Sequence, residues 1–149
     1  MSASYEFIEG PTSDLCFVAR GSSPEASFVA AGDALLAATV EDPGSVRERD
    51  TRMVALEEPD LELLLLRFLN ELVYLRDAEQ LLLRARHLRI SRGETVRLEA
   101  ELVGEPIDVE RHELAAEVKA ATAHALRVTP VAAREGQDPR WEATVTLDV

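Results

Sequence analysis

Hydrophobic and polar residues follow two periods along the chain, and together these periods predict both strands and helices. Residues 5–10 and 14–21 are short apolar runs bounded by Gly, Pro and Ser, which is typical of two strands joined by a turn. A helix is expected at about 24–39, because Ser23 and Pro24 form a helix start and apolar residues then recur at helical spacing.

The alternation continues through the middle and the end of the chain. Residues 46–56 are expected to form a strand, and 59–76 a long helix that is apolar over most of its circumference and therefore lies deep in the core. Residues 81–91 and 95–103 are expected to pair as a hairpin, because the second run alternates apolar and charged residues. The last strand, 141–149, is expected to turn these apolar residues inward: Trp141, Ala143, Val145 and Leu147.

The stretch from 104 to 131 fits two different periods. Its Ala-rich run has apolar residues at helical spacing, which favours a helix on propensity alone. The alternation from Thr122 to Val128 favours a strand instead. Periodicity leaves both structures open for this stretch.

The composition predicts one acidic, soluble domain. A chain of 149 residues with 46% hydrophobic content can bury a single core. It has no apolar run near the roughly 18 residues of a membrane helix and no visible export signal, so we expect a cytoplasmic protein without membrane contact. The formal charge of −12 argues against a protein that binds a phosphate backbone by itself. An acidic surface suits a basic protein partner or a metal ion better.

The end of the chain places two anions side by side. Asp148 directly precedes the Val149 carboxylate. If a sheet holds this tail, two unit charges roughly 5 to 6 Å apart repel by about 3 kcal/mol at an effective dielectric constant near 20. The tail therefore either frays into water or lies beside a cation.

Four blocks of sequence together carry a family resemblance. They are YEFIEGPTSDLCF at 5–17, FLNELVYLRD at 68–77, GEPIDVERHELAAEVKAATAHAL at 104–126 and ATVTLDV at 143–149. In order and spacing, these blocks resemble segments of the archease family over nearly the whole chain. The third block is the most specific, because its combination of Gly-Glu, Arg-His-Glu and Glu-Val-Lys is rare by chance.

The resemblance implies a fold and a function. It implies a single α+β domain over 1–149, with a mainly antiparallel sheet packed against two helices at about 24–39 and 59–76, and a strand at about 118–131. Archeases are small proteins that activate the RtcB-type RNA ligase of tRNA splicing and RNA repair, and they are not ligases themselves. Such an activator does not bind GTP or RNA directly, and acts on them only through its ligase.

The resemblance also implies a metal site. Carried over position by position, the family's divalent-metal ligands match Asp14, Asp148 and Val149. Ca²⁺ and Mg²⁺ prefer carboxylate oxygens, so the chemistry agrees, and Mn²⁺ is a further candidate. Without the resemblance, Asp14 reads as a turn residue that bonds nearby backbone amides. Three residues before this Asp the family usually has a His, and this chain has Pro11 instead. Two residues after the Asp the family has a Gly, and this chain has Cys16. Without the resemblance, Cys16 is expected to be a small buried hydrophobic residue.

Two polar clusters complete the candidate chemistry. The first cluster matches family positions that look functional, and it consists of His112, Glu113, Glu117 and Lys119. These residues form either a partner-binding face or an ordinary solvated face. His112 and Lys119 are both expected to be exposed. The basic cluster RARHLR at 84–89 either touches RNA or offsets the acidic surface.

Three classes of function fit these features. The leading class is a ligase activator that promotes guanylylation and repeated turnover through a metal-bearing acidic face. The second is a metal-dependent phosphoesterase built on Asp14 and Asp148. The third is a chaperone for RNA-modifying enzymes such as tRNA methyltransferases, which would need no metal.

Overall fold

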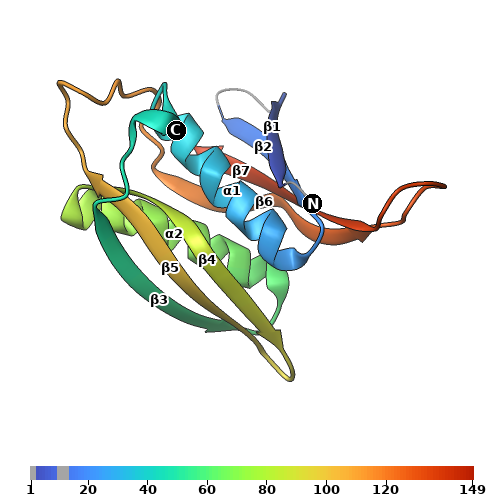
Figure 1. Cartoon of the computed structure of the whole chain (residues 1–149). Coiled ribbons are helices and arrows are strands. Elements are labelled where there is room, and N and C mark those ends of the chain that lie inside the picture. The colour runs from blue at the N-terminus through green and yellow to red at the C-terminus, as the bar shows by residue number, and fades with distance from the viewer. Residues whose placement is uncertain (1–2, 10–13) are drawn as a thin grey trace.

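The computed structural model describes residues 3–9 and 14–149, which form strands and helices in layers (Figure 1). The elements in chain order are β1 (Ser4–Ile8), β2 (Leu15–Gly21), α1 (Pro24–Thr39), the 3₁₀ turn η1 (Pro43–Ser45), β3 (Asp50–Glu58), α2 (Leu61–Glu79), β4 (Leu81–Arg92), β5 (Val96–Pro106), β6 (Ala120–Val131) and β7 (Arg140–Asp148). This arrangement confirms the predicted α+β class. The turn expected at 10–13 lies outside the described residues.

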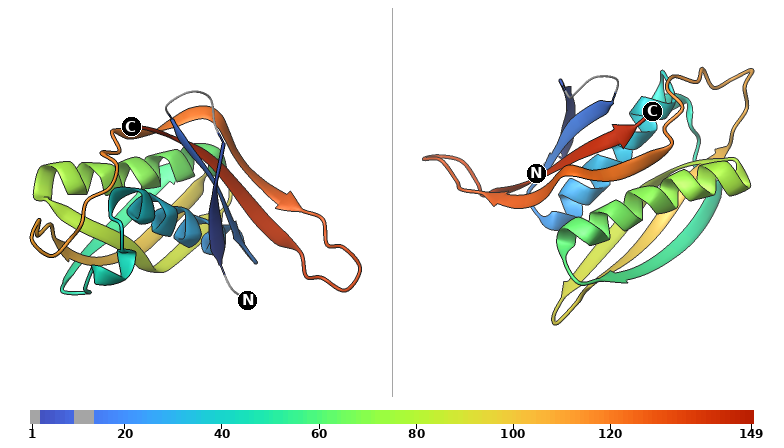
Figure 2. Two further views of the ribbon diagram at one scale, coloured as in Figure 1. Left: turned by 90° about the horizontal axis from the view of Figure 1, so that it is seen from above. Right: turned by 180° about the vertical axis from the view of Figure 1, so that it is seen from behind.

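The strands form two antiparallel sheets with both helices between them (Figures 1 and 2). One sheet has the order β1-β2-β7-β6, and the other has the order β3-β5-β4. The predicted antiparallel pairing is confirmed, and the structure divides it between two layers. Because each helix contacts both sheets, the inner faces of the two sheets share one apolar core.

The helices begin at their capping residues. The Ser23 side chain accepts a hydrogen bond from the Ala26 N–H at 3.1 Å, and Pro24 follows at the first helical position. The Asp60 side chain caps α2 by accepting from the Leu63 N–H at 2.9 Å, which is why α2 starts two residues later than expected. Its C-terminus is set by Gln80, which has a φ of 57°.

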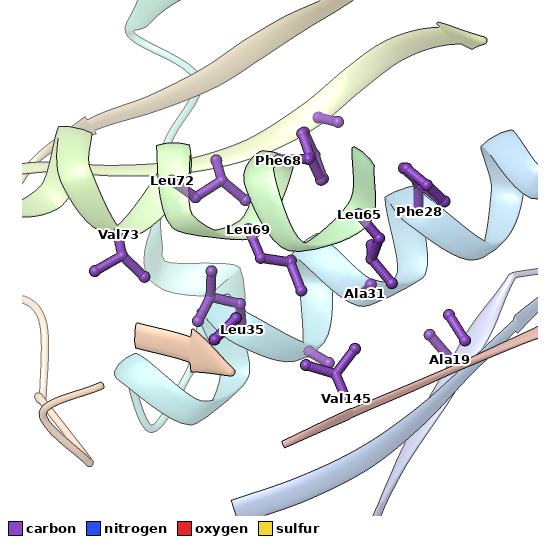
Figure 3. Packing of buried hydrophobic residues seen from close by; sticks show 14 of the residues in the cluster. Ala19, Phe28, Ala31, Leu35, Leu65, Phe68, Leu69, Leu72, Val73 and Val145 are labelled. Carbon is purple, nitrogen blue, oxygen red and sulfur yellow. The ribbon is translucent and has the colours of Figure 1, made fainter. Parts of the chain in front are cut away.

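The two helices are buried to different extents. Helix α1 is rich in small residues and buried around most of its surface, because it lies between the sheets. Helix α2 buries one face and exposes Leu63 and Tyr74 on the other. The expectation that this helix lies deep in the core is therefore correct for one face only. Figure 3 shows the packing between them, where Phe28 stacks on Phe68 with a centroid distance of 6.2 Å.

The ambiguous stretch from 104 to 131 contains a loop and then a strand. Strand β6 begins at Ala120, close to the predicted start at 118. The pairing of β6 with β7 is irregular between Thr122 and Arg127, and Ala125 there has a φ of 55°. The helical spacing of the Ala-rich run therefore misleads, because strand pairing determines the structure of this segment.

Candidate functional site

The chain's C-terminal end is held in the middle of a sheet. Strand β7 pairs with β2 on one side as far as Leu147 and with β6 on the other as far as Asp148. Val145 and Leu147 are fully buried as the alternation predicts, and Val149 packs against the main core. Strand pairing therefore holds the backbone of the tail in the sheet as far as Asp148.

The register of the sheet brings the predicted metal ligands to one end. Leu15 pairs with Leu147, so continuing the β2–β7 register by one residue sets Asp14 opposite Asp148. Opposite residues of an antiparallel pair project to the same face. Ala120 pairs with Asp148 from the other side, and the Lys119 N–H donates to the Asp148 carbonyl at 2.8 Å. The sheet thus places Lys119 beside Asp148 and Val149, and the extended register directs Asp14 to the same end.

The donor chemistry of these residues fits a hard divalent cation. Asp14 and Asp148 are half-buried, so their side chains remain partly accessible. Among residues 3–9 and 14–149, no group of three or more His, Cys, Asp or Glu side chains forms a metal cluster. The predicted set contains two such side chains, and its third donor is the Val149 carboxylate. Oxygen ligands of this kind suit Ca²⁺, Mg²⁺ or Mn²⁺.

Cys16 lies beside this end of the sheet and is buried, as expected. It pairs with Thr146, and its Sγ lies 3.4 Å from Thr146 Oγ1. Cys16 lies two residues after Asp14, and Thr146 lies two residues before Asp148. Pro11, which stands where the family has a His, is among the residues that the structure does not describe.

His112 corrects one prediction. It was expected to be exposed, but only 1% of it is accessible to solvent. Its Nδ1 accepts from the Asp108 N–H at 2.9 Å, so a neutral ring carries its proton on Nε2 and donates it to Glu105 Oε2 at 2.9 Å. His112 is therefore a structural residue, and replacing it is not expected to leave the fold unchanged.

Glu105 is the buried charge at the centre of this cluster, and the sequence reasoning missed it. Its carboxylate accepts hydrogen bonds from the Arg111 side chain, the Arg47 N–H and His112. These bonds, that of Arg111 above all, outweigh burial and lower the pKa of Glu105 to about 2. The sequence did contain a signal for this cluster: Glu105 lies at the apolar end of a strand, and two possible partners, Arg111 and His112, follow six and seven residues later.

The 107–119 segment, which joins β5 to β6, is fixed to the C-terminus of α1. The N–H groups of Ala115 and Ala116 donate to the carbonyls of Thr39 and Ala38 at 2.8 and 3.0 Å. These are carbonyls that a helix end leaves without intrahelical partners. A further bond, from Arg76 to the Val118 carbonyl at 2.6 Å, ties the segment to α2.

This anchoring determines which predicted residues face solvent. Glu113, Glu117 and Lys119 are exposed on the 107–119 segment, whereas His112 and Val118 turn inward. The segment ends at Lys119, beside Asp148. The structure therefore places three of the four predicted partner-facing residues on one accessible stretch that leads to the candidate metal site.

The basic cluster at 84–89 is largely neutralised by glutamates. Arg84 and Arg86 both pair with Glu48, and Arg86 also pairs with Glu101 at 2.7 Å. Arg89 lies 3.9 Å from Glu99. Of the two interpretations of this cluster, the pairing favours the one in which it offsets acidic surface.

This architecture defines a class of small α+β proteins in which two antiparallel sheets pack around two helices, and an acidic C-terminal end emerges from an inner strand of the four-stranded sheet. The chain belongs to the Archease protein family, whose model matches residues 5–149.

Named relatives share this similarity over nearly their full length. The chain is 38% identical to Protein archease of Thermococcus gammatolerans over 139 residues, which is 93% of this chain and 94% of the relative. It is 34% identical to Protein archease of Pyrococcus abyssi over the same coverage of each chain.

A solved structure has a similar fold. The solution structure of Methanobacterium thermoautotrophicum protein 1598 matches with a TM-score of 0.79 and 29% identity, covering 97% of this chain and 98% of that one. In the described part of this chain, neither helix combines the length and apolarity that crossing a bilayer requires.

Proposed function

We propose that the protein is an accessory factor that activates an RtcB-type RNA ligase in the cytoplasm. Family membership supports this, because a ligase-activating role is what the archease resemblance implies. The observation that supports the proposal is the β2–β7 register, which, continued by one residue, directs Asp14 toward Asp148 and Val149 at a partly accessible sheet end. Carboxylate oxygens are ligands that hard divalent cations prefer, and phosphoryl transfer uses such cations.

In this proposal each part of the site has a distinct task. Asp14, Asp148 and the Val149 carboxylate hold a divalent ion, which is Ca²⁺, Mg²⁺ or Mn²⁺. When bound, the ion supplies positive charge that can stabilise a phosphoryl group during its transfer. The strand pairing of β7 on both sides fixes the backbone that carries Asp148, so little backbone ordering of this end is needed when a partner docks.

The exposed charges of the 107–119 segment give the site a partner-facing edge. Glu113, Glu117 and Lys119 line the approach to the carboxylates, and the formal charge of −12 favours a basic protein surface over nucleic acid. The protein therefore binds the ligase, and it acts on GTP and RNA only indirectly, through the ligase. Its effect is to promote transfer of GMP onto the ligase and thereby repeated turnover.

A ligation time course with limiting ligase tests this proposal. Adding the protein should convert near-single-turnover ligation into multiple turnover, while the protein alone joins no RNA. A turnover number that stays unchanged at saturating protein would contradict the activator role. Metal-dependent hydrolysis of a phosphoester by the protein alone would favour the phosphoesterase, and metal-independent stabilisation of the partner enzyme would favour the chaperone.

A further inference from the structure

A hollow of about 320 Å³ lies beside the 107–119 segment, where this segment crosses the C-terminal ends of α1 and α2. In Figure 1 the segment is the loop between β5 and β6. The lining is mostly apolar and also carries two acidic residues and one basic residue: Ile107, Leu114, Ala115, Ala116, Asp77, Glu117 and Arg76. We call this feature the segment hollow.

The apolar wall of the segment hollow is exposed and fixed in place. Leu114 is 47% exposed, which is high for a leucine. Its backbone forms an isolated bridge with Val40, and the next residue, Ala115, donates to the Thr39 carbonyl. Leu114 therefore cannot turn inward without breaking these bonds, and the hollow is preorganised for an apolar side chain.

Two acidic residues and one basic residue, Arg76, line the segment hollow, and only one of the acidic residues is paired with a residue that the structure describes. Asp77 already pairs with Arg76 at 2.8 Å, and Arg76 also donates to the Val118 carbonyl. The side chains of Glu117 and Glu113, by contrast, make no ion pair or hydrogen bond with any residue that the structure describes. Glu117 thus offers an available carboxylate directly beside an apolar surface.

We propose that the segment hollow is a docking site for a basic segment of a partner protein, which inserts an apolar side chain beside Leu114 and pairs an adjacent Lys or Arg with Glu117. The partner is the RNA ligase, so this inference rests on the proposed function. Charge complementarity selects this occupant, because Glu113 and Glu117 would repel the phosphates of RNA. The apolar contact supplies affinity, and the ion pair supplies orientation.

The affinity of the purified ligase for variants of the full chain tests this inference. Leu114→Asp and Glu117→Lys should each raise the Kd by about tenfold, and the protein concentration for half-maximal activation should rise in parallel. Met53→Asp is the matched apolar control, because Met53 is 72% exposed on the other sheet. Glu94→Lys is the matched charge control in the exposed turn between β4 and β5. Both controls should bind as the parent does.

The outcomes separate this inference from the proposed function. If the parent activates the ligase and Leu114→Asp and Glu117→Lys bind it as tightly as the controls, the docking site is wrong and the activator role stands. If the parent neither binds nor activates the ligase, the proposed function itself fails. If Leu114→Asp weakens binding of the ligase and Glu117→Lys does not, the partner segment does not pair a basic residue with Glu117, and this part of the inference is wrong. Thermal unfolding verifies that each variant is folded, and Leu114→Gln replaces Leu114→Asp if the latter unfolds early.

Discussion

At Glu105, a carboxylate with only 1% exposure keeps its negative charge because three donors surround it. Burying a charge is costly unless such partners compensate for it. The cluster links the end of β5 to Arg47 before β3 and to Arg111 and His112 in the 107–119 segment. Its role is to fix the start of the segment that carries the exposed glutamates.

The lowered pKa of Glu105 predicts a specific pH dependence. Its folded value of about 2 lies below the ordinary 4.5, so the stabilisation is complete above pH 4.5 and is lost as the pH falls toward 2. Glu105→Gln should lower the free energy of unfolding by about 3 kcal/mol at pH 7. When the pH is lowered from 5 to 2, the free energy of unfolding should fall less for this variant than for the parent. Urea unfolding across this range measures both effects.

A matched control is available for the Glu105 variant. Glu94→Gln removes an exposed carboxylate from the turn between β4 and β5, so its pH profile should follow that of the parent. Parallel profiles for the parent and Glu105→Gln would show that Glu105 contributes nothing that depends on its charge.

At the scale of elements, the close approach of β4 and β5 depends on Gly104. A Cβ built at this position would overlap the carbonyl oxygen of Leu82 on β4. Gly104 also pairs with Asp50 on β3, so β5 is held from both sides and cannot shift away. A side chain here would have to force the central strand of the sheet out of register.

Gly104→Ala should therefore destabilise the protein by about 3 kcal/mol, as expected for overpacking against rigid backbone. Gly93→Ala in the β4–β5 turn is the control, since its nearest neighbouring atom lies 4.0 Å from the added Cβ. That change should stay within about 0.5 kcal/mol. Chemical denaturation measures both, and equal stability of the two variants would contradict the close-approach argument.

The elements differ in how far the sequence could predict them. Ser23 and Pro24 mark the start of α1 correctly, because capping depends on local residues. The alternation at the end of the chain correctly predicts buried Val145 and Leu147. Periodicity does not reveal the burial of His112, because its partner Glu105 becomes a neighbour only when the 107–119 segment folds back. Likewise, the division into two sheets depends on pairing between distant strands.

At the scale of the whole molecule, an acidic protein concentrates further negative charge at one end. The formal charge is −12, and the sheet brings Asp14 toward Asp148 and Val149. A bound cation would relieve their repulsion, so the folded state should gain RT ln(1 + [metal]/Kd). This gain is about 2.7 kcal/mol at a hundredfold excess over Kd. Asp14→Asn and Asp148→Asn should abolish this gain and leave the metal-free protein at least as stable.

The central claim is that Asp14, Asp148 and the Val149 carboxylate form one divalent-metal site. Calorimetric titration of the metal-stripped protein with Ca²⁺, Mg²⁺ and Mn²⁺ tests it most directly. The parent chain should bind a single ion saturably, Asp14→Asn and Asp148→Asn should each lose this binding, and a C-terminal tag should weaken it by moving the carboxylate away from Val149. An absence of binding at millimolar concentrations of all three ions would contradict the site.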